Sequence, residues 1–205
     1  MVRATGASLK KIPWLVFGLM LLFAILYVTR TVADMPPLVA SHFDSAGHAN
    51  AYMARSSYTK FILGTLIEER VALQERHGKR VPLLVKVAPD LSEAQVSELA
   101  QQLRSLQPDG VIATNTSSDL NVLGKPAAEH RGGLSGAPLH SLSVKVITQL
   151  RAELGADFPI IGVGGIVSAA NARETLRAGA NLLQVYTGFA YRGLGLLEEL
   201  IGSPE

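Results

Sequence analysis

Short apolar runs alternate with longer helix-patterned segments along the chain from Val81 onward. The apolar runs are uniformly hydrophobic, as is typical of strands buried on both faces, and they begin near Val81, Gly110, Pro159 and Asn181. A segment with helical periodicity follows each run, over residues 93–106, 141–154, 169–178 and 188–201. Strands that alternate with helices in this way predict four parallel βα units with right-handed crossovers.

Capping residues mark the ends of the predicted helices. Ser92 and Gln95 form the pattern of a capping box at the start of the first helix, and Ser168 precedes the third. Gly179 follows the third helix, where a C-terminal glycine is expected. A further amphipathic helix is predicted over residues 65–77, ahead of the first strand.

The N-terminal segment has a different pattern. Ile12–Thr29 carries no charge, and the stretch 12–33 is long enough to span a bilayer. We therefore expect a membrane anchor over residues 1–34, and a single-pass protein of the bacterial inner membrane. A signal peptide is the alternative, but no A-x-A-like cleavage site follows. Basic residues ahead of the segment favour a cytoplasmic N-terminus, which would place the rest of the chain outside, so the side of the soluble part stays open.

Residues 35–64 combine prolines, a glycine and scattered polar residues, which predicts a loop-rich linker before a domain over residues 65–205. Three potential metal ligands lie in this linker, but nothing fixes their geometry, and a solvated loop is the simpler interpretation. The first 60 residues resemble a bacterial membrane-protein family of unknown function (DUF1648), which shows a P-x-x-x-x-x-H-F-x-x-x-G-x-x-x-x-Y pattern. The residues that match it are Pro37, His42, Phe43, Gly47 and Tyr52.

Composition narrows the possible functions. The chain of 205 residues has no cysteine, which excludes disulfides and cysteine-based metal sites. The net charge of +2 is too small to indicate nucleic-acid binding, so no nucleic-acid partner is expected. One domain with a sizeable core fits this length.

Polar residues and glycines stand at the C-terminal end of every predicted strand. They are Lys86, Thr114, Asn115, Gly164, Gly165, Tyr186 and Thr187. Ligand sites of parallel α/β folds lie at these strand ends, because the ends share one edge of the sheet. Four strands that each bring such groups to one edge predict a binding site there.

The glycines after the third strand suit a phosphate group. Their missing side chains let an anion approach the backbone, and their amides and the N-terminus of the following helix would supply donors. The spacing is G-V-G-G rather than G-x-G-x-x-G, so the dinucleotide fingerprint is not met. A tight turn without a ligand is the alternative on this motif alone.

Five motifs in the same order resemble the C-terminal half of class 2 dihydroorotate dehydrogenase. They are V-K-V-A-P-D-L, D-G-V-I-A-T-N-T, G-G-L-S-G-A-P-L, P-I-I-G-V-G-G-I and Q-V-Y-T-G-F, within residues 65–203. The resemblance implies strands five to eight of a TIM-type β/α barrel. It also implies FMN as cofactor, dihydroorotate or orotate and quinone as partners, and a place in pyrimidine biosynthesis.

The same resemblance implies roles for individual residues. Lys86 resembles a lysine that contacts the flavin, and Asn115 and Thr116 resemble the pair that hydrogen-bonds orotate. The remaining cofactor-binding candidates are Thr114, Gly136, Gly164, Gly165, Tyr186 and Thr187. Without the resemblance, Lys86 could equally form a salt bridge at the rim, Asn115 and Thr116 could cap a strand end, and Tyr186 could pack on the rim.

The chain also departs from the family. No stretch of residues 1–80 resembles its first four barrel strands or the N-x-S-S-P-N type segment that bears the catalytic serine base. We therefore expect a truncated or chimeric dehydrogenase that is inactive alone, with two unpaired edge strands that invite self-association. The alternatives are a non-catalytic single-pass membrane protein with a half-barrel interaction module, and a fusion of two unrelated gene pieces.

Overall fold

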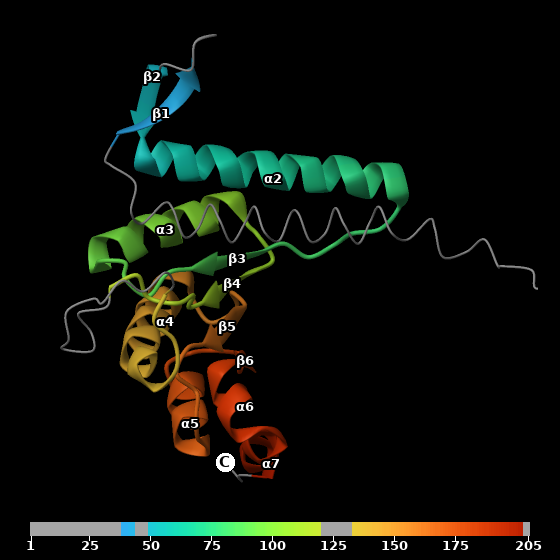
Figure 1. The fold of residues 1–205 in the computed structure, drawn as a ribbon. Coiled ribbons are helices and arrows are strands. Elements are labelled where there is room, and N and C mark those ends of the chain that lie inside the picture. The colour runs from blue at the N-terminus through green and yellow to red at the C-terminus, as the bar shows by residue number, and fades with distance from the viewer. Residues whose placement is uncertain (1–37, 44–48, 120–132, 203–205) are drawn as a thin grey trace, which may run out of the picture.

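Four parallel strands form the sheet on which the site is built. The computed structural model describes residues 38–43, 49–119 and 133–202. Within them the sheet has the order β3-β4-β5-β6, and every neighbouring pair is parallel (Figure 1). Its strands are β3 (Leu84–Val87), β4 (Gly110–Ala113), β5 (Ile160–Val163) and β6 (Leu182–Gln184). The predicted sheet of four parallel strands is confirmed.

Helices connect the strands and cover one side of the sheet. The connecting helices are α3 (Glu93–Leu106), α4 (His140–Leu154), which a 3₁₀ turn η2 (Ala137–Leu139) precedes, and α5 (Ala169–Arg177). They pack in sequence, α3 on α4 and α4 on α5 (Figure 1). The capping box of Ser92 and Gln95 is present, with Ser92 N donating to Gln95 Oε1 over 2.8 Å.

The last predicted helix, residues 188–201, is two helices in the structure. α6 (Thr187–Arg192) and α7 (Leu194–Gly202) are separated by Gly193. Gly193 has a φ of 57°, in the left-handed region, and its amide donates to Phe189 O over 2.7 Å. A residue in this conformation ends α6 and turns the chain into α7.

The segment predicted to be a loop-rich linker contains regular structure. β1 (Leu38–Phe43) and β2 (Ala49–Ala54) form an antiparallel pair, and α2 (Arg55–His77) begins ten residues before the predicted helix. Gly64, the last residue of the predicted linker, lies inside α2. An added Cβ there would meet only Leu106 Cδ2 at 4.0 Å, and a single glycine in a long helix costs only about 1 kcal/mol relative to alanine.

No helix within the described ranges is long and apolar enough to cross a membrane. The predicted anchor over residues 1–34 lies outside those ranges.

The core lies between the sheet and the helices. Val85, Val111 and Ile160 are register partners on neighbouring strands and are at most 2% exposed. They belong to one buried cluster with residues of α3 and α4, namely Val96, Ala100, Leu103, Val146, Ile147 and Leu150. This shared packing fixes the strand ends relative to one another.

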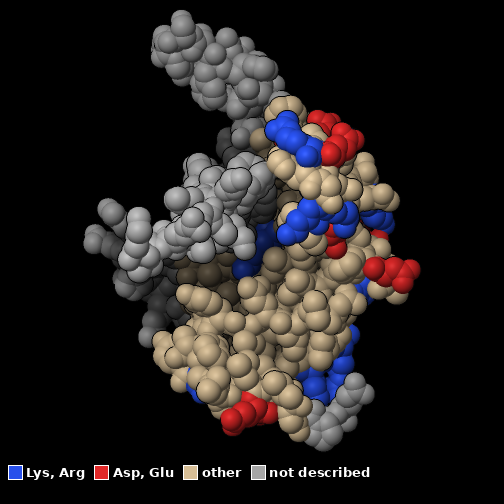
Figure 2. Space-filling model, turned by 90° about the vertical axis from the view of Figure 1, so that its right-hand side faces the viewer, with Lys and Arg blue, Asp and Glu red and all other residues tan. Residues whose placement is uncertain are grey.

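The opposite face of the sheet carries a second row of side chains. Lys86, Ile112, Ile161 and Leu182 are successive register partners across all four strands. Lys86, Ile112 and Ile161 are half-buried, while Leu182 is 63% exposed. Figure 2 shows one face of the molecule, with a broad area free of charge and most charged side chains near its margins.

Asp109 joins α2 to the amino end of the sheet. Its carboxylate accepts from Arg70 over 2.5 Å, from the Leu83 amide over 2.7 Å and from Arg80. Burial alone would raise the pKa of Asp109, but the Leu83 amide and the two guanidiniums together hold it below its ordinary value. The three bonds tie α2 and the β3–β4 edge to one carboxylate.

We expect Asp109→Asn to lower the free energy of unfolding at neutral pH by about 2 kcal/mol, since charged hydrogen bonds are lost. The pKa of Asp109 is lower in the folded state, so this contribution is present above the unfolded pKa and is lost as pH falls through the folded one. The free energies of unfolding of parent and variant, measured with urea, should therefore converge at acidic pH. Asp157→Asn, on an exposed loop, is the control. An equal loss in the free energy of unfolding in both variants would contradict the stabilising role of Asp109.

Candidate functional site

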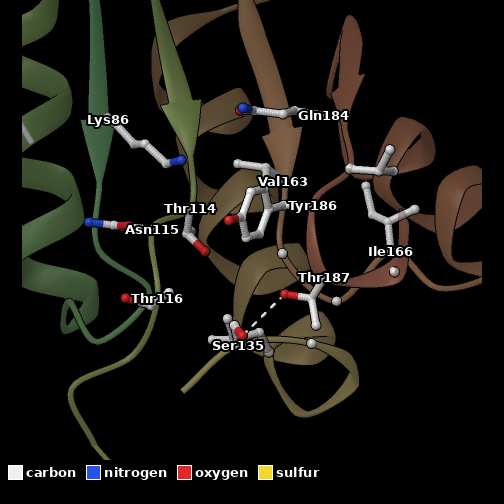
Figure 3. Close-up of a pocket in the computed structure, with 16 residues that line it drawn as sticks. Lys86, Thr114, Asn115, Thr116, Ser135, Val163, Ile166, Gln184, Tyr186 and Thr187 are labelled. Atoms are coloured by element: carbon white, nitrogen blue, oxygen red, sulfur yellow. Dashed lines mark hydrogen bonds between the residues drawn. The ribbon is translucent and has the colours of Figure 1, made fainter. Parts of the chain in front are cut away.

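A pocket of about 270 Å³ opens at the carboxyl ends of the four strands (Figure 3). All nine residues singled out from the sequence line it: Lys86, Thr114, Asn115, Thr116, Gly136, Gly164, Gly165, Tyr186 and Thr187. Parallel packing brings together groups that are up to a hundred positions apart in the chain. The structure thus places them at one site, while their binding roles stay predictions.

Lys86 supplies a positive charge to this pocket. Its side chain points from β3 into the pocket, toward Thr114 and Tyr186 (Figure 3). It is half-buried, and within the described residues it forms no salt bridge. Burial lowers the pKa of Lys86 because it disfavours the charged form. An anion at this position would relieve that cost, so Lys86 is suited to anion binding rather than to a rim salt bridge.

The chain after β4 is held on both sides by main-chain bonds. Thr114 N donates to Val163 O over 2.5 Å, and Asn115 N donates to Val87 O over 2.6 Å. The Thr114 hydroxyl is buried and lies 2.8 Å from the hydroxyl of Ser143 on α4. In contrast, the side chains of Asn115 and Thr116 have no hydrogen-bond partner in the described structure, so their polar groups are available to a ligand.

The two glycines after β5 are required by packing. Gly164 and Gly165 have φ of 128° and 67°, which L side chains rarely adopt. A Cβ on Gly164 would collide with Ser143 Oγ, and one on Gly165 would lie 2.5 Å from His140 N. Glycine is therefore needed here with or without a ligand, and its presence alone is no evidence of phosphate binding.

The glycine turn after β5 offers unpaired donors for an anion, whereas two amides at the start of the next helix are already paired within the described residues. Within the described residues, the amides of Gly164 and Gly165 have no hydrogen-bond acceptor. At the start of α5, Ala169 N donates to Glu199 over 2.7 Å, and Asn171 N donates to Ser168 Oγ over 3.3 Å. The Ala169 amide, followed by Arg192, lowers the pKa of Glu199. These two amides of the first turn are therefore already paired, and the role of this helix N-terminus in binding the ligand stays a prediction.

The loop before α4 meets the end of β6 across the pocket. Thr187 Oγ1 donates to Ser135 Oγ over 3.1 Å, and Gly136 lies beside Thr187, with 3.2 Å from an added Cβ to Thr187 Cγ2 (Figure 3). Tyr186 is 81% exposed, so it does not pack on the rim. Sequence reasoning missed Ser135 and Gln184 as lining residues and Ser143 beneath the pocket. Ser135 and Gln184 stood within the quoted motifs, whereas Ser143 had no signal beyond a helix position.

The sequence profile of the dihydroorotate dehydrogenase family matches residues 45–203. The chain belongs to this family. It is 55% identical over 137 residues to dihydroorotate dehydrogenase (quinone) of Verminephrobacter eiseniae, covering 66% of this chain and 38% of that protein. With the enzyme of the same name from Leptothrix cholodnii it shares 55% identity over 139 residues, covering 67% of this chain and 40% of that protein.

Solved structures of the dihydroorotate dehydrogenase family share the fold. The crystal structure of the Eimeria tenella enzyme in complex with ferulenol superposes with a TM-score of 0.63 at 30% identity, covering 71% of this chain and 42% of that one. The ligand-free form gives a TM-score of 0.55 at 35% identity, covering 60% and 34%. The chain thus spans about two-fifths of the length of its curated relatives.

The resemblance of residues 1–60 to the DUF1648 family is not supported. The dihydroorotate dehydrogenase profile begins at residue 45, so Gly47 and Tyr52 of that pattern fall within the dehydrogenase match. The interpretation of the first 60 residues as one separate membrane-protein module therefore has no support.

The groups of the pocket suit binding better than proton transfer. A cation, free amides and hydroxyls converge there, but none of the described lining residues carries a carboxylate or an imidazole. A cation with neutral donors binds a planar anion, whereas proton abstraction requires a base of suitable pKa within reach.

Proposed function

We propose that this chain supplies the cofactor- and substrate-binding half of an FMN-dependent dihydroorotate dehydrogenase of the quinone type. The observation that carries the proposal is the convergence of nine family-type residues from four strand ends and the loop before α4. Lys86, which has no ion-pair partner within the described residues, is among them. The four βα units would correspond to strands five to eight of the family's barrel, and the pocket to its carboxyl-end rim.

The residues present fit FMN. Lys86, half-buried and without a counter-charge among the described residues, would hold the flavin ring where negative charge develops, and the buried Thr114 would contact it. The amides of Gly164 and Gly165, which have no acceptor in the described part of the chain, would hold the phosphate together with Gly136, Tyr186 and Thr187. FMN, when bound, supplies the hydride acceptor for dihydroorotate and the electron donor for quinone.

Asn115 and Thr116 would bind the pyrimidine. The side-chain amide of Asn115 offers both a donor and an acceptor, which matches the alternating groups of an imide edge. Both side chains are unpaired in the described structure and line the pocket. Oxidation of dihydroorotate to orotate removes one hydride and one proton. These two residues orient the ring for that loss, but neither of them accepts the proton.

We expect FMN to bind through Lys86, with affinity that falls as pH rises. The protonated amine would donate to the flavin ring and attract the negative charge that the ring carries when reduced, so binding weakens as pH passes through the lowered pKa of Lys86. Lys86→Gln should weaken binding about tenfold and remove this pH dependence. Flavin fluorescence titration and the absorbance of the purified protein measure both effects.

The matched control for the lysine test is Lys145→Gln, since Lys145 lies on α4 in an exposed pair with Glu93. It should bind FMN as the parent does. Failure of the parent to alter the flavin spectrum, or equal loss in both variants, would contradict the proposed site.

We also propose that residues 12–33 anchor the protein in the bacterial inner membrane. The support is the charge-free stretch Ile12–Thr29 with basic residues ahead of it. We expect the expressed chain to sediment with membranes and to need detergent for release. Recovery of the full chain in the soluble fraction without detergent would contradict the anchor.

A further inference from the structure

Asp90 is a partly buried carboxylate on a loop; it lies outside the pocket lining and has no role in the proposal above. It follows β3 in the P-D-L motif, and both of its oxygens accept hydrogen bonds from the loop after β4. Oδ1 accepts from Ser117 Oγ over 2.5 Å, while Oδ2 accepts from Ser118 N over 2.7 Å and Ser118 Oγ over 3.1 Å. Three bonds from two consecutive residues fix that loop on the end of β3.

Ser117 passes this restraint to a third loop. It is fully buried, and its main chain pairs with Leu134 through bonds of 3.0 Å and 2.8 Å. The next residue, Ser135, accepts from Thr187 at the end of β6 (Figure 3). A continuous set of bonds thus runs across the rim of the pocket, from Asp90 through Ser117 and Leu134 to Thr187.

Asn115 and Thr116 lie directly before the anchored pair. The Asn115 amide is fixed on Val87 O, and Ser117 and Ser118 are fixed on Asp90, so the backbone is held on both sides of Thr116. Gly133 packs so closely on Thr116 that an added Cβ would collide with its hydroxyl. The backbone is therefore restrained, while the two residues line the pocket and their side chains have no hydrogen-bond partner within the described residues.

We infer that Asp90 is a positioning residue that sets affinity for the pyrimidine ligand by holding Asn115 and Thr116 in place. The inference rests on the proposed function for the identity of the ligand, but the restraint on the loop does not depend on any ligand. Among the proposed phosphate contacts, Gly164 and Gly165 lie outside this set of bonds, and Thr187 is reached only through Leu134 and Ser135, whereas Asn115 and Thr116 directly precede the residues bonded to Asp90. The carboxylate should therefore affect orotate and phosphate differently.

The test is Asp90→Asn in the full chain. The substituted amide is nearly the same size, but it carries no charge and only one of its two terminal atoms can accept, so it cannot accept from both Ser117 and Ser118. Orotate affinity, titrated with FMN present, should fall about tenfold, as for loss of a hydrogen bond to a charged group, while inorganic phosphate should bind as in the parent. Hydrogen exchange should become faster at the amides of residues 117–119 and stay unchanged in α3 and α4. Asp157→Asn removes the same charge from an exposed loop and should change none of these.

The outcomes separate this inference from the proposed function. Unchanged exchange at residues 117–119, or equal loss of orotate and phosphate affinity, would overturn the positioning role. A parent that binds no orotate would overturn the proposed ligand alone. In that case faster exchange in Asp90→Asn would still support the restraint, and unchanged exchange would overturn it.

Discussion

A preparation of residues 1–205 alone is expected to show no measurable oxidation of dihydroorotate, even with FMN and quinone supplied. The pocket holds groups suited to binding, but its described lining offers no carboxylate or imidazole. No stretch of the sequence resembles the segment that bears the family's serine base. Loss of a positioned base alone reduces a rate by about 10²–10⁴-fold. A dye-reduction assay, run beside Lys86→Ala, measures the effect.

Robust turnover by the parent that is lost in Lys86→Ala would contradict this expectation. The assay must be controlled for self-association. Strands β3 and β6 are the edges of the described sheet, and unpaired edges can pair with another chain. We propose that two copies can pair in this way, yet the pair would duplicate the same lining without adding a recognisable base. Sedimentation at assay concentration shows which species is present; a single monomeric species at all concentrations would exclude the pairing.

Gly165→Ala should be the most damaging single substitution in the site. The new Cβ would lie 2.5 Å from His140 N and 2.7 Å from His140 Cα, and this backbone cannot move without shifting the start of α4. The φ of 67° adds the cost of a left-handed alanine. We expect the collision and the left-handed φ together to lower the free energy of unfolding by about 3 kcal/mol, and we expect FMN binding to be lost as well.

Urea unfolding compared with Gly78→Ala isolates the steric part of this effect. Gly78 has a similar φ of 64°, and an added Cβ there would meet nothing within 4 Å. Its substitution should cost only the conformational part, about 1 kcal/mol. Similar losses for the two variants would show that His140 does not constrain the turn.

The alternation of apolar runs and helical periods predicted the sheet well, because buried parallel strands leave a continuous hydrophobic signal. Strand β4 and helix α3 have the predicted bounds. The failures occurred where local signals were weak or ambiguous. The linker was predicted to extend to Gly64, but this glycine is tolerated inside α2, and Gly193 was not recognised as a break between α6 and α7.

The lining of the pocket was predictable because the motifs fall at strand ends. The network that holds the lining was not predictable, since it depends on distant residues meeting in space. Nothing in the sequence indicates that Asp90 accepts from Ser117 and Ser118, or that Glu199 of α7 occupies the start of α5. Such pairings have no periodicity, so only the three-dimensional arrangement reveals them.

Because helices cover only one side of the described sheet, the heat capacity change and the m-value of unfolding should also be affected. Heat capacity increases on unfolding in proportion to the apolar area that becomes exposed to water, and the denaturant m-value follows the total area exposed. The row of Ile112, Ile161 and Leu182 is only partly covered, so it adds less to both quantities than the row of Val85, Val111 and Ile160. The chain should therefore unfold with the heat capacity change and m-value of a smaller domain, and any partner that covers the exposed row should raise both.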